Sequence, residues 1–392
     1  MRVYPFQRRS PSRLGSLIPG VAVAIIVFGG AVTLVLNRGW LANAHAELQG
    51  AVNAIALASA SQLASDDLLR KEVNSEARIQ VIRRSAAAFA AKHSVAGRAA
   101  YVSDDSEDDI QFGRRLASSL TGQQRFIRTN ETPTTIVVTG HRDGQSGNPV
   151  KLLFPFLTGI AAGDVRCVAE AAISNDISGL RPFEDANVPA WPIAILESCP
   201  QPALQCWRRQ ILLGMADDEY AWDFDAQEIR HAPDGIGEIT LWSDAPPAQC
   251  NMCLNDLGNH LNGDDLTRQI KTGWSLTDLS ALGGELNFDQ FPLNASAVCR
   301  LDNNVFQELQ NQIGQVRIVC LYVPATNTHA PRSSKIQLTG CVAVRLLDLR
   351  RIHGKTRVVV QPAVIATRMA VPSDDQLSPH SQPYIYRVAL TN

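Results

Sequence analysis

Cysteine is the residue type in this chain whose spacing most suggests specific chemistry. Cys250 and Cys253 form a C-x-x-C pair, the spacing of half a zinc site or of a redox dithiol. No second C-x-x-C or H-x-x-x-H pair follows at the usual distance, and His260 is the only nearby imidazole. The pair also lacks the strand-to-helix setting of a thioredoxin-type dithiol. We expect structural disulfides here, with a metal site and a redox site as the weaker alternatives.

The full set of cysteines lies beyond residue 166, after the longest apolar run of the chain. If this apolar run crosses a membrane and the cysteines lie on its exported side, their even number fits disulfides formed in an oxidising compartment. The spacing does not determine the pairing. The candidate disulfide residues are Cys167, Cys199, Cys206, Cys250, Cys253, Cys299, Cys320 and Cys341.

Signatures of enzymatic sites are missing from the sequence. It contains no G-x-S-x-G, no H-E-x-x-H and no G-x-x-x-x-G-K-[ST] motif. His141 lies in a turn-rich stretch, which favours a surface residue over a general base. The net charge of −2 gives no reason to expect a nucleic-acid partner. We predict a non-enzymatic protein with no catalytic residue, metal, cofactor or small-molecule substrate.

Residues 14–36, LGSLIPGVAVAIIVFGGAVTLVL, form a run without charge. As a helix it is about 34 Å long, enough to cross a hydrocarbon core of about 30 Å. The preceding residues 1–13 hold several arginines and no acidic residue, and positively charged flanks stay cytoplasmic. We therefore expect a single-pass inner-membrane protein with a cytoplasmic basic tail and the bulk of the chain periplasmic. The alternative, a cleaved signal peptide, has an apolar core of about 7–15 residues, clearly shorter than this run.

A helical stripe of small and apolar residues follows the predicted span. Residues 38–64 are alanine-rich and free of proline, and the apolar positions recur at spacings of three and four. One continuous helix should leave the bilayer and pack this stripe on the protein's own outer domain or on another subunit. The candidate packing face is Leu41, Leu48, Val52, Ile55 and Leu63.

The remaining chain indicates an α+β fold with antiparallel strands in two units. A helical stalk over residues 37–95 includes a second helix at 75–93, and the acidic stretch 103–109 favours a solvated loop over a calcium site. A small membrane-proximal unit spans 96–180, and a proline cluster after Pro182 marks the junction. The larger, β-rich unit spans 181–392. Its predicted strands are 237–242, 315–323, 335–349, 356–368 and 384–390, and its predicted helices are 266–271, capped by Asp264 or Asp265, and 305–313, capped by Asp302 or Asn303.

Residues 36–60, LNRGWLANAHAELQGAVNAIALASA, resemble the amino-terminal module of TadG-like proteins of the Tad (Flp) pilus-assembly system. That module runs from a membrane helix into an acidic residue and Gly, then E-L-Q-N-A-A-D-A-A-A-L-A-G-A. Two family aspartates appear here as Asn37 and Asn53, and Gly50 replaces an asparagine. The positions that match are Gly39, Glu47, Leu48, Gln49, Ala51, Ala54, Ala56, Leu57 and Ala58.

Three carboxyl-terminal segments, 264–289, 305–323 and 338–362, resemble the exported region of large TadG-like proteins of planctomycete-type bacteria, in the same order. The resemblance covers both ends and about half of the chain. It implies a membrane-held component of a Tad-type pilus or tight-adherence secretion apparatus, with other components of that apparatus as partners. The alternatives are a membrane-tethered periplasmic binding module or hydrolase unrelated to pili.

Overall fold

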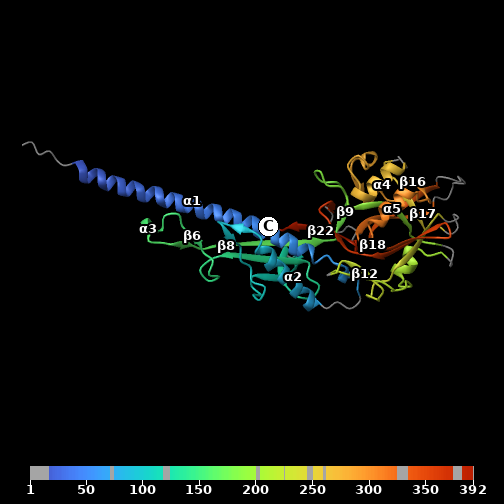
Figure 1. Ribbon diagram of the computed structural model, residues 1–392, viewed down its shortest axis with the longest axis horizontal. Helices are drawn as coiled ribbons and strands as arrows, with labels where there is room; N and C mark the ends of the chain where they lie inside the picture. The colour runs from blue at the N-terminus through green and yellow to red at the C-terminus, as the bar shows by residue number, and fades with distance from the viewer. Residues whose placement is uncertain are drawn as a thin grey trace, which may run out of the picture.

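The computed structural model describes residues 17–70, 75–117, 124–199, 204–224, 226–244, 250–258, 262–324, 334–373 and 382–391. The molecule is elongated (Figure 1). One long helix runs from its amino-terminal tip into a first sheet, and a second, rounder unit lies beyond that sheet. The predicted basic tail, 1–13, and the start of the apolar run lie outside the described residues.

The long helix, α1 (Leu17–Ser61), has 45 residues and a length of about 68 Å at 1.5 Å per residue. Its sequence favours one uninterrupted helix because alanine and leucine abound and the only proline, Pro19, lies in the first turn. A 3₁₀ turn, η1 (Asp66–Leu69), follows, and α2 (Ser75–Ala90) folds back against α1.

A six-stranded sheet packs along the second half of α1. Its strand order is β20-β22-β8-β5-β3-β4, and its pairs are antiparallel except for β20 with β22. Residues of β8 alternate between buried and exposed, as expected for a sheet with one covered face. The strands are β3 (Ile110–Ala117), β4 (Gln124–Arg128), β5 (Thr135–Arg142), β8 (Val165–Ser174), β20 (Ile365–Ala366) and β22 (Ile385–Leu390).

Two short strand pairs border this sheet. One is β1 (Ser94–Val95) with β2 (Arg98–Ala99). The other is β6 (Val150–Lys151) with β7 (Ala162–Gly163), joined through the single turn α3 (Pro155–Thr158). In Figure 1, β6 and α3 lie farther toward the amino-terminal tip than the six-stranded sheet does.

The second unit is built on a seven-stranded sheet, five strands of which close into a ring. β17 pairs with both β10 and β18, and β18 returns to β10 through β16 and β14. The pairing of β10 with β17 is parallel, and the others in the ring are antiparallel. The strands are β10 (Ala190–Leu196), β13 (Ile239–Ser243), β14 (Met252–Asn255), β16 (Leu293–Val298), β17 (Val316–Pro324), β18 (Ser334–Ile352) and β19 (Lys355–Pro362). We call this unit the barrel.

Shorter elements complete the barrel and its junction with the first sheet. A three-stranded sheet ordered β15-β9-β21 lies between them. These elements are β9 (Ile177–Leu180), η2 (Arg208–Leu212), β11 (Ala221–Asp223), β12 (Glu228–Arg230), α4 (Gly263–Thr272), η4 (Ser280–Leu282), β15 (Leu286–Asn287), η5 (Phe288–Gln290), α5 (Asn303–Gln310) and β21 (Ala370–Pro372).

The structure has the predicted α+β composition: one long apolar helix followed by a sheet-rich region with antiparallel strands. Several details differ from the prediction, of which three concern the arrangement of the elements. The proline cluster contains β10, a strand of the ring whose residues are all buried. Pro192 is tolerated in this strand because it coincides with a register shift in the pairing with β17. β22 pairs with β8, so the carboxyl-terminal strand belongs to the first sheet and not to the second unit. Asn262, not Asp264 or Asp265, caps α4.

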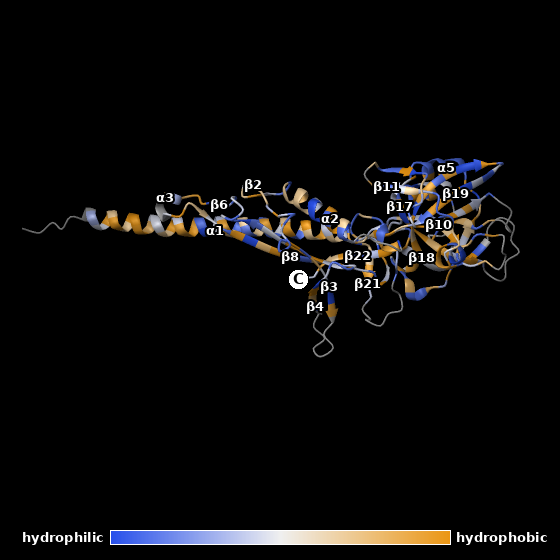
Figure 2. Cartoon of the chain, turned by 90° about the horizontal axis from the view of Figure 1, so that it is seen from below, coloured by the Kyte–Doolittle hydropathy of each residue, from blue (hydrophilic) through white to orange (hydrophobic). Residues whose placement is uncertain are grey.

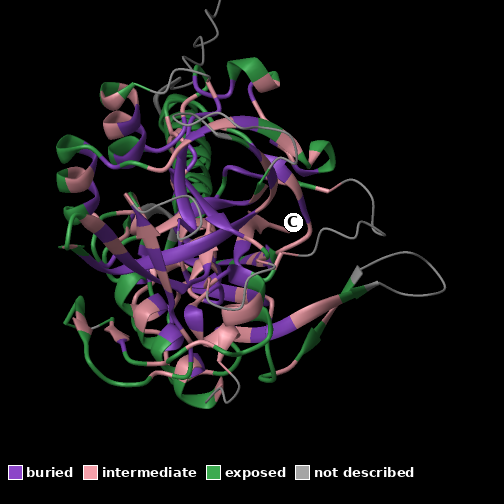
Figure 3. Cartoon of the chain, turned by 90° about the vertical axis from the view of Figure 1, so that its right-hand side faces the viewer, coloured by how far each residue is buried: buried purple, intermediate pink, exposed green. Residues whose placement is uncertain are grey.

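Each unit has its own apolar core, as the purple strands of Figure 3 show for the barrel. The core of the first unit lies between α1, α2 and the six-stranded sheet. The larger core fills the barrel and includes the fully buried Trp191, Trp207 and Trp274. The molecule is therefore two packed units joined end to end, with α1 projecting from the first.

Candidate functional site

The first half of α1 exposes an apolar surface. No charged residue occurs from Leu17 to Asn37, and the apolar side chains of this half face outward, with Ile26 73% and Phe28 72% exposed. Figure 2 shows this part of the helix as predominantly hydrophobic and standing clear of the sheets. By length and composition, this helix could span a membrane.

The second half of α1 buries its apolar residues on the protein's own sheet. Of the predicted packing face, Leu48, Val52, Ile55 and Leu63 are fully buried in the core of the first unit. Leu41 is partly buried at the edge of that core. The stripe therefore packs within the chain, the first of the two arrangements that the sequence left open.

Close approach of helix and sheet depends on a glycine. Gly140 of β5 lies directly under α1, and a Cβ atom there would be 2.4 Å from the Cγ2 atom of Val52. Because such a distance is far below van der Waals contact, any larger residue at position 140 would push the helix off the sheet. A small residue on the strand thus complements a β-branched residue on the helix.

Polar residues in the second half of α1 make contacts with the first unit. The Glu47 carboxylate accepts a hydrogen bond from the backbone N–H of Ala96 at 2.8 Å. The Gln49 amide donates to the carbonyl of Val168 in β8 at 3.1 Å and to the side chain of Asn53 at 2.9 Å. These residues attach the helix to the first unit.

The β6–α3–β7 hairpin (residues 150–163) is also fixed to α1, at the level where the apolar half ends. The side-chain oxygen of Asn37 accepts hydrogen bonds from the backbone N–H groups of Leu153 and Phe154, at 3.1 and 3.2 Å. The indole N–H of Trp40 donates to the carbonyl of Lys151 at 3.1 Å. The sequence did not predict this docking, because a polar Asn37 directly after an apolar run does not show which distant segment it will bind.

A buried ion pair connects the end of the helical region to the barrel. Asp66 of η1 lies 2.6 Å from Arg345 of β18, and both side chains are almost fully buried. The second carboxylate oxygen of Asp66 accepts a hydrogen bond from the backbone N–H of Val364 at 2.7 Å. Arg345 also lies over the ring of Trp222, 4.7 Å from its centroid. We call Asp66 and Arg345 the latch.

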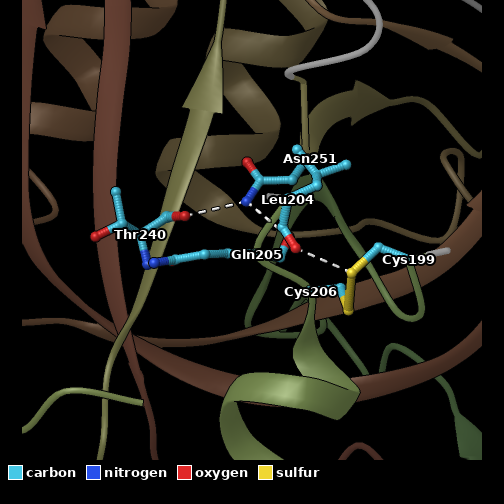
Figure 4. Close-up of a disulfide and its surroundings, with 6 residues drawn as sticks. All are labelled: Cys199, Leu204, Gln205, Cys206, Thr240 and Asn251. Atoms are coloured by element: carbon cyan, nitrogen blue, oxygen red, sulfur yellow. Dashed lines mark hydrogen bonds between the residues drawn. A yellow bond between two sulfur atoms is a disulfide. The ribbon is translucent and has the colours of Figure 1, made fainter. Parts of the chain in front are cut away.

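One disulfide joins candidate cysteines, Cys199 to Cys206, in the segment after β10 (Figure 4). Next to it, the Asn251 side chain donates hydrogen bonds at 3.0 Å to the carbonyls of Gln205 and Thr240. The loop that holds the disulfide is thereby tied to strand β13. The other cysteines of the predicted set are thiols in the structure.

Five of those thiols lie together in the barrel. Cys320 and Cys341 are register partners on β17 and β18, with their sulfur atoms 4.0 Å apart. Side-chain hydrogen bonding with Cys250 and Cys253 lowers the pKa of Cys299 to about 4. The hydrogen bond to Cys299 and burial both raise the pKa of Cys250. The C-x-x-C pair is thus a buried thiol cluster and not a disulfide of its own.

Cys167 is separate from the other cysteines. It lies in β8, under α1, with its sulfur 3.4 Å from a ring nitrogen of His45. Burial raises the pKa of this thiol. The even cysteine count suggested complete pairing, but this residue belongs to the first unit, while the others belong to the segment after β10 and to the barrel.

His141 is not the surface residue that its turn-rich sequence suggested. It lies at the end of β5, and its side chain is 13% exposed. Its ring nitrogens lie 2.9 Å from Asp109 and 3.2 Å from Asp143. The Ser146 N–H, together with His141, lowers the pKa of Asp143. This arrangement clamps the 103–109 loop, of which Asp109 is buried, to the turn after β5.

Across the described ranges, no group of three or more His, Cys, Asp or Glu side chains is arranged to hold a metal ion. The fold defines an α+β protein whose amino-terminal helix could cross a membrane and whose remaining chain forms two packed units. No protein-family profile, curated protein or solved structure matches the chain.

Proposed function

We propose that this chain is a membrane-anchored, non-enzymatic component of a pilus-assembly or tight-adherence apparatus of the Tad (Flp) type. One observation carries the proposal: a single uninterrupted helix has an exposed apolar first half and a second half that forms the core of the first unit. Since no loop separates the two halves, the ectodomain is held at a set distance and orientation from the bilayer. Such a design suits a protein that presents surfaces to partners.

The proposed orientation places the amino terminus in the cytoplasm and the two units in the periplasm. Four arginines in residues 1–13 support this, since positive flanks stay cytoplasmic. The disulfide between Cys199 and Cys206 also supports it, because disulfides persist in oxidising compartments. In this orientation, the ectodomain faces the compartment in which pilus components assemble.

The resemblance to TadG-like proteins supports the assignment to a pilus apparatus. Three residues of the shared pattern have structural roles here: Leu48 lies in the core, and Glu47 and Gln49 make polar contacts with the first unit. Because these residues are occupied within the chain, we place the contacts with other components on the ectodomain surface and not on this part of α1.

Affinity isolation of the detergent-solubilised protein from its own cells, followed by mass spectrometry, tests the proposal. We expect a Tad-type platform protein, secretin or pilin among the recovered chains. A control variant in which residues 17–36 are replaced by an unrelated membrane span should recover the same components, because the contacts lie on the ectodomain. Reproducible recovery of the anchored protein alone would contradict the pilus role.

A further inference from the structure

Beyond the anchor helix, the β6–α3–β7 hairpin presents large apolar side chains to solvent. Leu153, Phe156 and Ile160 are 49%, 79% and 57% exposed, and all three lie in this one short connection. Exposed apolar residues scattered singly are common on protein surfaces, whereas several together mark an interaction site. The environment that these side chains face can be inferred from the point at which the hairpin is attached to α1.

The hairpin is attached at the level of the proposed bilayer boundary. Asn37, which accepts hydrogen bonds from the backbone N–H groups of Leu153 and Phe154, directly follows the apolar run. Thr33 of α1, one turn inside that run, is only 4% exposed, while its neighbours Leu34 and Val35 are exposed. Four helical residues correspond to about 6 Å. Together with the contact between α1 and α3, the buried Thr33 indicates that the hairpin covers this turn.

Polar and aromatic residues around the hairpin match an interfacial position. Trp40, whose indole N–H binds the hairpin, lies just beyond the apolar run, the depth at which tryptophan is enriched in membrane proteins. A hollow of about 450 Å³ beside the hairpin has Arg98 and Lys151 as its charged lining residues. Cations at this level attract anionic lipid headgroups.

We propose that the hairpin tip, through Leu153, Phe156 and Ile160, inserts into the outer leaflet of the bilayer that α1 crosses. This inference rests on the proposed membrane anchor and adds a second contact with the same membrane. The occupant is lipid because the apolar tip is continuous with the exposed apolar half of α1. Two contacts would fix the tilt and rotation of the ectodomain, which a single helix leaves free.

Photo-crosslinking in the full-length protein tests the insertion. Phe156→p-benzoylphenylalanine conserves an aromatic side chain, and the protein is reconstituted into nanodiscs of phosphatidylethanolamine and phosphatidylglycerol. Phe28→p-benzoylphenylalanine, in the middle of the proposed span, is the positive control. Phe183→p-benzoylphenylalanine, at an exposed phenylalanine after β9, is the negative control. After irradiation, covalent lipid adducts are measured by mass spectrometry of the peptide that carries the probe.

We expect lipid adducts at positions 28 and 156 and at least a tenfold lower yield at position 183. Adducts at position 28 without adducts at position 156 would overturn the insertion and leave the anchor intact. A dimeric protein adduct at position 156 would replace lipid by a second copy of the chain and also overturn it. Lipid adducts at neither position would overturn the anchor, and the insertion with it.

Discussion

The two halves of α1 are both rich in apolar residues but have opposite surroundings. In the first half the apolar residues cover the whole circumference and are exposed, whereas in the second half they form one stripe and are buried on the sheet. The difference lies in the distribution of polar residues: Asn43, Glu47 and Gln49 interrupt only the second half. A helix that is apolar all round suits lipid, and one with an apolar stripe suits a protein surface.

The largest expected effect comes from the latch that follows the packed half. Asp66→Ala leaves Arg345 buried without its carboxylate partner, and removing one member of a buried pair costs about 3–5 kcal/mol. We expect that loss in the free energy of unfolding, measured by urea titration of the detergent-solubilised protein.

Asp67→Ala is the matched control for the latch. Asp67 pairs with Arg70 at 2.7 Å, but both side chains are about one-third exposed, so we expect a loss of about 0–1 kcal/mol. Equal losses for the two variants would show that the packed half does not depend on its ion pair with the barrel.

A matched pair of leucines compares the two halves of the helix directly. Leu48→Ala removes a fully buried side chain and should lower the free energy of unfolding by about 2–5 kcal/mol. Leu34→Ala makes the same chemical change at a 59% exposed position and should change it by less than about 0.5 kcal/mol. The same urea titration measures both. If Leu34→Ala lowered the free energy of unfolding as strongly as Leu48→Ala, the two halves would not be distinct environments.

The sequence predicted the long apolar helix and its buried stripe well because both signals are local. An uncharged run of residues 14–36 predicts a span, and a spacing of three and four predicts the buried face of Leu48, Val52 and Ile55. Most strands of the barrel are also visible as apolar segments. These patterns depend only on residues close together in the chain.

The latch and the hairpin docking could not be predicted in this way. Asp66 and Arg345 are 279 positions apart, and Asn37 and Leu153 are 116 apart. Nothing local distinguishes a carboxylate that will be buried from a solvated one. Closure of the ring likewise depends on the pairing of β17 with both β10 and β18. The proline in β10 argues against a strand there, so the sequence does not predict this element. The pairing of the cysteines could not be predicted for the same reason, because an even number of cysteines does not show which of them lie close together in the fold.

A charge placed in the exposed half should act on membrane insertion and leave the two packed units folded. Ile26→Asp should cost about 2.5–3.5 kcal/mol of insertion free energy, which releases the protein from the membrane or leads to its degradation. Alkaline extraction of membranes measures retention, with Ile26→Leu as the control. Normal retention of Ile26→Asp would contradict the anchor. A lowered urea midpoint of the detergent-solubilised protein would contradict the separation of the two halves.

The smallest effect tests the polar contacts that distinguish the packed half. Gln49→Ala removes the donor to the Val168 carbonyl, and losing a partly exposed hydrogen bond of this kind costs about 0.5–1.5 kcal/mol. Asn43→Ala, which removes only an exposed contact with Glu47 four residues away, should cost about 0.2–0.5 kcal/mol. Hydrogen exchange separates the two variants, because only Gln49→Ala should speed exchange in β8. If it did not, apolar packing alone would hold the helix on the sheet, and the polar residues of the shared pattern would be free to serve another partner.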